Sequence, residues 1–72
     1  MTLEVTMFSE QVKYVRKILN ISQNKLAQTL GVSYATINRW ENSKNAPSQL
    51  AQISFYDFCE NNFINLDELK KL

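Results

Sequence analysis

The sequence has no histidine and only one cysteine, Cys59. Zinc sites, haem sites and most acid–base catalysts depend on imidazole groups or on clustered thiolates. A lone cysteine provides neither a disulfide framework nor a thiolate cluster. The sequence also lacks a nucleophile–base pair and a glycine-rich phosphate loop. We therefore expect a protein that is not an enzyme and that binds no metal and no cofactor.

Long apolar runs are also missing. No stretch approaches the length of a transmembrane helix, and the N-terminus lacks the charged-then-apolar pattern of a signal peptide. We therefore expect no membrane partner and a location in the reducing cytoplasm. At 72 residues the chain is expected to form one domain over residues 1–72.

The chain contains a single glycine, Gly31, and a single proline, Pro47, which favours helices joined by short connections. Ser22 and Ser33 are typical helix N-caps, whereas Asn20 and Gly31 suit the left-handed residue that ends a helix. Together with the apolar spacing, these residues predict helices over 8–19, 23–30, 34–42 and 48–61, and a short fifth helix from Asn65 or Asp67. The predicted fold class is all-α.

The first seven residues do not follow this helical pattern. Apolar Leu3, Val5 and Met7 alternate with Thr2, Glu4 and Thr6. Residues 1–7 therefore have two interpretations, a short β arm that pairs with a second copy of the chain or a disordered tail.

Charge is distributed unevenly along the chain, although the net charge is only +1. Residues 11–48 contain six basic side chains against the single acid Glu41: Lys13, Arg16, Lys17, Lys25, Arg39 and Lys44. Both flanks are acidic on balance. A basic middle suggests one face that attracts a polyanion, with an ordinary solvated surface as the alternative.

The spacing across Gly31 is that of a helix-turn-helix unit, in which two helices flank a glycine turn. Counted from Gln23 as position one, Ala27 is fifth, Gly31 ninth, Ile37 fifteenth and Trp40 eighteenth. A small residue is needed where the two helices cross closely, and glycine where the chain turns with a positive φ. Ile37 and Trp40 would hold the second helix against the first, which leaves its other face outward.

These residues, "SQNKLAQTLGVSYATINRWENSK" from Ser22 to Lys44, resemble the phage-repressor and Cro-like helix-turn-helix proteins of the XRE family. The resemblance covers residues 8–47, and residues 48–72 supply C-terminal helices. It implies a compact four- to five-helix lambda-repressor-like domain whose helices 2 and 3 form the motif. It also implies a structural pair between Arg16 and Glu41.

In this family the N-terminal part of the third helix enters the major groove of double-stranded DNA. The positions that contact bases then correspond to Tyr34, Ala35, Thr36, Asn38 and Arg39. Arg39 is the strongest candidate, because its planar group can donate twice to guanine O6 and N7. For Tyr34 and Asn38 an ordinary surface role remains an equal alternative.

The family's phosphate-contacting positions correspond to Gln23, Ser33, Asn42, Ser43 and Lys44, which would set register and affinity without reading sequence. The family often has glycine where this chain has Ser43. If Ser43 needed a positive φ, the backbone there would be mildly strained.

Residues 48–64 hold more apolar side chains than one helix face needs. On a helical wheel Leu50, Ala51, Phe55 and Phe58 form one side, and Ile53, Tyr56, Phe63 and Ile64 another. One of these two sides can close the core. The other is surplus and suggests a homodimer on a palindromic operator, unless the aromatics fold back over the core.

The predicted function is therefore a sequence-specific, double-stranded DNA-binding transcriptional regulator, with a repressor favoured. The alternative is an antitoxin-like or adaptor protein that binds another protein through its aromatic fourth helix.

Overall fold

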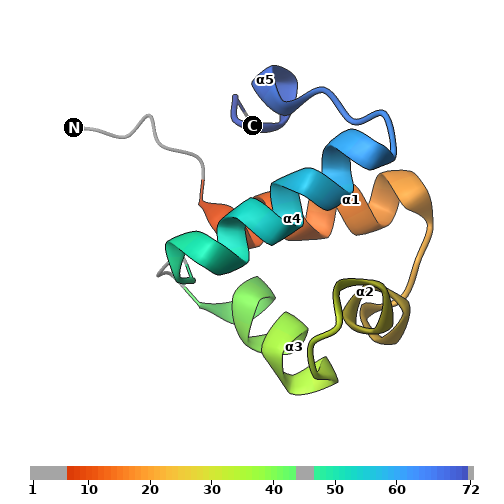
Figure 1. Cartoon of the computed structure of the whole chain (residues 1–72), viewed down its shortest axis with the longest axis vertical. Coiled ribbons are helices and arrows are strands. Elements are labelled where there is room, and N and C mark those ends of the chain that lie inside the picture. The colour runs from red at the N-terminus through yellow and green to blue at the C-terminus, as the bar shows by residue number, and fades with distance from the viewer. Residues whose placement is uncertain (1–6, 44–46, 72) are drawn as a thin grey trace.

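Five helices make up the computed structural model, which describes residues 7–43 and 47–71 (Figure 1). They are α1 (Phe8–Leu19), α2 (Gln23–Leu30), α3 (Tyr34–Asn42), α4 (Gln49–Asn61) and α5 (Leu66–Leu69). No strand occurs within the described ranges, so the all-α prediction is confirmed. The predicted β arm lies outside these ranges, except for Met7, the extended N-cap residue of α1. No described helix has both the length and the apolar character that crossing a bilayer requires.

The predicted capping residues end α1, begin and end α2, and begin α3. The hydroxyl of Ser22 accepts the backbone N–H of Lys25 at 3.0 Å, and that of Ser33 accepts the N–H of Thr36 at 3.1 Å. Asn20 and Gly31 end α1 and α2 in the left-handed conformation, with φ of 56° and 73°. The fourth helix starts one residue later than predicted, because Ser48 is its N-cap rather than its first residue.

All five helices contribute buried side chains to the core, and its aromatic part lies where α1, α3 and α4 meet. The Phe8 ring makes edge-on contacts with Trp40, Phe55 and Tyr56, at centroid distances of 5.5, 5.1 and 6.2 Å. The remaining buried apolar side chains are Val12, Val15, Leu26, Ala27, Ile37, Cys59 and Leu69. One aromatic ring at the start of α1 thus joins the motif helix α3 to the C-terminal helix α4.

The wheel grouping for the fourth helix is wrong at Leu50, which is 77% exposed although the wheel places it on the same side as the fully buried Phe55. The buried line of α4 runs through Phe55 and Cys59, and Tyr56 folds back to donate its hydroxyl to Gln11 Oε1 at 2.7 Å. Burial raises the pKa of Cys59 to about 12, with help from the charge of Glu60, so the thiol stays protonated at neutral pH. Cys59 is a packing residue of the core.

Phe63 combines two unfavourable features in the turn after α4. Its φ is +63°, and its side chain is 98% exposed. The N–H groups of Phe63 and Ile64 bond back to the carbonyls of Glu60 and Cys59, at 3.1 and 3.0 Å, in the pattern of a Schellman motif. Glycine is the preferred residue at this left-handed position.

Phe63→Gly should therefore raise the free energy of unfolding by about 1 kcal/mol, because it relieves the left-handed strain and loses no buried contact. Urea denaturation at low protein concentration measures the change. Asn20→Gly is the matched control, since Asn already tolerates the left-handed conformation and should change little. A loss of stability in Phe63→Gly would contradict the expectation.

Candidate nucleic-acid interface

The motif helices α2 and α3 pack through small and branched apolar side chains. Ala27 is buried on α2, and Ile37 and Trp40 are buried on the inner face of α3. Figure 1 shows α2 and α3 together on one side of the molecule, away from α5. The opposite face of α3 therefore points away from the core, as the predicted spacing requires.

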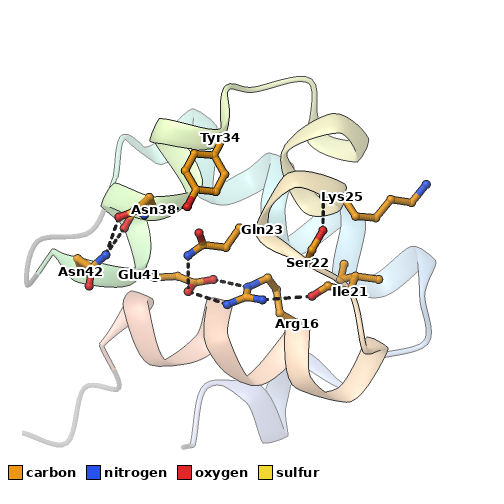
Figure 2. A network of polar contacts seen from close by, with 9 residues as sticks. All are labelled: Arg16, Ile21, Ser22, Gln23, Lys25, Tyr34, Asn38, Glu41 and Asn42. Carbon is orange, nitrogen blue, oxygen red and sulfur yellow. Dashed lines mark hydrogen bonds and ion pairs between the residues drawn. The ribbon is translucent and has the colours of Figure 1, made fainter.

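A polar junction ties α3 to both preceding helices (Figure 2). Arg16 of α1 donates from Nε to Glu41 Oε2 at 2.6 Å and from Nη2 to Oε1 at 3.0 Å. Gln23, the first residue of α2, donates from Nε2 to Glu41 Oε1 at 2.9 Å. Arg16 also reaches the carbonyl of Ile21 from Nη1 at 3.2 Å. The pair between Arg16 and Glu41 is thus present, and Gln23 extends it.

The junction keeps a buried carboxylate charged. Burial alone would raise the pKa of Glu41, but the hydrogen bonds from Arg16 and Gln23, together with the charges of Arg16 and Lys13, hold it below the ordinary value of 4.5. The hydrogen bond to Glu41 raises the pKa of Arg16 against the effect of its burial. Both groups are ionised at neutral pH, so Arg16 contributes no net charge to the outer surface.

The five predicted base-contacting residues all lie on α3, but their surroundings differ. Tyr34, Ala35 and Arg39 are exposed, whereas Asn38 and Thr36 are half-buried. The Thr36 hydroxyl lies 2.9 Å from that of Ser33 and belongs to the helix cap. Among the described residues, Arg39 has no hydrogen-bond or ion-pair partner, so its guanidinium is available to a ligand.

Tyr34, Asn38 and Asn42 form a row of polar side chains along α3 (Figure 2). Asn42 Nδ2 donates to Oδ1 of Asn38 at 2.7 Å and to its backbone carbonyl at 2.8 Å. Asn38 Nδ2 donates in turn to the Tyr34 hydroxyl at 3.4 Å. Tyr34, Asn38 and Asn42 were predicted as separate DNA contacts, although their spacing of four residues was visible in the sequence.

The predicted phosphate-contacting residues differ in whether their side chains are already engaged within the protein. Ser33 caps α3, and the Gln23 amide is engaged by Glu41, although Gln23 still begins α2 beside the positive end of its helix dipole. The strain considered for Ser43 does not arise, because its φ is −98°. Lys44 lies outside the described residues. The structure therefore gathers Gln23 with the Tyr34–Asn38–Asn42 row around the junction, while Ser43 lies beyond the C-terminal end of α3.

Comparison with known protein families identifies the family of this chain. A protein-family model described as Helix-turn-helix matches residues 12–51, more than half of the chain. The chain belongs to the XRE family of Cro/C1-type helix-turn-helix proteins. Searches of curated proteins and of solved structures gave no match.

Membership of the XRE family identifies the chain as a double-stranded DNA-binding regulator. The match begins at Val12 in α1 and ends at Ala51 in the first turn of α4. It thus includes α2, α3 and the whole polar junction. The match does not favour the alternative of an adaptor that acts through its fourth helix.

Proposed function

We propose that this XRE-family chain is a sequence-specific repressor that binds a palindromic operator as a homodimer, with the N-terminal part of α3 in the major groove. The observation that carries the proposal is the outer face of α3. Tyr34, Ala35 and Arg39 project from it, and Arg39 has no partner among the described residues. An arginine without an internal partner can give two N–H donors of its guanidinium to one base.

Arg39 supplies the specificity in this proposal. Its guanidinium donates two parallel hydrogen bonds to O6 and N7 of guanine, a pattern that no other base offers in the major groove. Ala35, four residues earlier on the same face, packs against a thymine methyl group. The start of α2 presents free backbone N–H groups to a phosphate, which fixes the register of α3 over the bases.

The homodimer is supported by apolar side chains that the described core leaves exposed. Leu50 and Ile53 lie on the outer face of α4, Ile18 on α1 and Phe63 in the turn between α4 and α5. A two-fold axis would place two copies of α3 about 34 Å apart, one helical turn of DNA. Sedimentation of the protein with a duplex carrying the selected site should give two chains per duplex, and one chain per duplex would refute the dimer.

The proposal is tested by selecting bound duplexes from a randomised DNA library at near-physiological salt. Enrichment of a palindrome with an invariant guanine in each half supports it, and the absence of any enriched sequence refutes it. Repression is tested separately. Transcription from a promoter that overlaps the selected site should fall on adding the protein, whereas activation would contradict the repressor role.

Arg39→Ala should weaken binding to the selected site by about 1–3 kcal/mol, roughly 5- to 150-fold, and remove the preference for guanine at one position. Arg39→Lys is the matched comparison, because it keeps the charge and loses the bidentate geometry. We expect it to recover affinity for DNA in general without recovering the guanine preference. Equilibrium titrations against duplexes with each of the four bases at that position measure both effects, and an unchanged guanine preference in Arg39→Ala would contradict the role of Arg39.

A further inference from the structure

The side-chain hydrogen bonds along the Tyr34–Asn38–Asn42 row all run in one direction: Asn42 donates to Asn38, and Asn38 donates to Tyr34. Asn42 has two amide hydrogens and two short bonds to Asn38, at 2.7 Å to Oδ1 and 2.8 Å to the carbonyl oxygen. Because a phosphate group can only accept, an Asn42 amide that donates twice to Asn38 has no hydrogen left for the DNA backbone. The contacts on α3 thus give Asn42 a role other than the predicted phosphate contact.

The bond from Asn42 fixes which way the Asn38 amide points. It holds Oδ1 of Asn38 toward the C-terminal end of α3, so that Nδ2 faces Tyr34, one turn nearer the N-terminal end (Figure 2). Tyr34 accepts from Asn38 and keeps its own hydroxyl hydrogen for another acceptor. Hydrogen bonds in such a series polarise one another, which favours a single direction of donation.

We infer that Asn42 is a positioning residue for sequence recognition: it orients the Asn38 amide so that Asn38 and Tyr34 act as hydrogen-bond donors toward a base. This inference rests on the proposed entry of α3 into the major groove. The bases that fit are those whose groove edge accepts, through purine N7, guanine O6 or thymine O4. Cytosine, whose edge offers the N4 amino donor, is rejected at this position.

The test uses the site selected by the full chain, with four duplexes that differ at the base pair facing Asn38. The wild-type protein should bind the duplex with cytosine at least about 5-fold more weakly than the best of the four, as a single wrong contact implies. In Asn42→Ala the Asn38 amide is free to turn and accept from cytosine N4, so this discrimination should fall to less than about 2-fold. Asn42→Asp should reverse the discrimination, so that cytosine is preferred. A carboxylate only accepts hydrogen bonds, so it draws the Asn38 nitrogen toward itself and turns the Asn38 oxygen toward the base.

Asn62→Ala is the matched control. Asn62 Nδ2 donates to the carbonyl of Phe58 at 2.8 Å, four residues earlier on α4, as Asn42 does on α3. This variant removes the same kind of helix-end bond away from α3 and should leave discrimination among the four duplexes unchanged. Thermal melts of every variant establish that each is folded at the temperature of the titration.

A double-mutant cycle separates positioning from phosphate contact. Adding Asn42→Ala to Asn38→Ala should change binding by less than about 2-fold, because the residue through which Asn42 acts is gone. The opposite result is an equal loss of affinity on all four duplexes in Asn42→Ala, additive with that of Asn38→Ala and accompanied by a shallower salt dependence. This result would identify Asn42 as a phosphate contact, and it would overturn the inference but not the proposed function. A wild-type protein that selects no site would overturn the proposed function and this inference together.

Discussion

Replacing Glu41 by alanine is expected to lower the free energy of unfolding by about 2–4 kcal/mol. The Glu41 side chain is only 5% exposed, and it accepts from Arg16 at 2.6 Å and from Gln23 at 2.9 Å. Its removal leaves the Arg16 charge without a counter-charge in a largely enclosed place. Because a quarter of the Arg16 side chain still reaches water, we expect less than the full penalty of a deeply buried charge.

Glu10→Ala is the control for this substitution. Glu10 pairs with Lys13 at 3.5 Å, and both side chains are exposed. A pair of this kind contributes at most about 0.5 kcal/mol, so thermal or urea unfolding should separate the two variants clearly. Similar small losses in Glu41→Ala and Glu10→Ala would show that the junction does not hold the three helices together.

The contribution of Glu41 should also depend on pH in a defined direction. The junction holds the pKa of Glu41 below its ordinary value of 4.5, so the folded protein binds this proton more weakly than the unfolded chain. The stabilisation is therefore complete above the unfolded value and is lost as the pH falls through the folded value. The difference in stability between wild type and Glu41→Ala should be constant near neutrality and shrink below about pH 4.5, as urea titrations at several pH values would measure. A difference that grows on acidification would contradict this assignment.

Phe55→Ala is expected to cost about 3–5 kcal/mol, the largest effect of any single substitution considered for this protein. The Phe55 ring is fully buried and meets the rings of Phe8 at 5.1 Å and Tyr56 at 5.6 Å. Its loss leaves a cavity between α1 and α4 that the surrounding helices cannot fill. A domain of this size has little stability to spare, so much of the variant should be unfolded at 37 °C.

Phe63→Ala makes the same chemical change at an exposed position. The Phe63 side chain is 98% exposed in the single chain, so at a protein concentration too low for dimers its removal should change stability by less than about 0.5 kcal/mol. Far-ultraviolet circular dichroism during urea denaturation gives both values. Comparable losses in the two variants would mean that Phe63 is covered in solution, as it would be in a tight dimer.

The two turns that join the first three helices could be predicted because their signals are local. Ser22 and Ser33 can each satisfy a free N–H at a helix start, and Asn20 and Gly31 tolerate the left-handed backbone at a helix end. These effects depend on residues within one turn of each other. The helix-turn-helix spacing could be predicted for a similar reason, since Ala27 and Gly31 meet constraints imposed by two adjacent helices.

The orientation of α4 could not be predicted, because apolar side chains occur on nearly every side of it. The wheel placed Leu50 with Phe55, whereas the structure buries Cys59 with Phe55 and leaves Leu50 in solvent. Contacts with distant residues decide this, above all the packing of Phe8 of α1 against Phe55. The bond from Gln23 to Glu41 was missed because it joins residues 18 positions apart and because the family resemblance, which supplied the pair between Arg16 and Glu41, assigned Gln23 to a phosphate.

The junction of Arg16, Gln23 and Glu41 has a consequence for the heat of DNA binding. It fixes α3 against α1 and α2 in the free protein, so we expect no ordering step in residues 7–43 when the protein binds DNA. A chain that folds as it binds shows a large negative heat-capacity change from the apolar surface that it buries internally. Here calorimetric titration should give a heat-capacity change that reflects only the surface shared with DNA, and association should lose little conformational entropy within the motif.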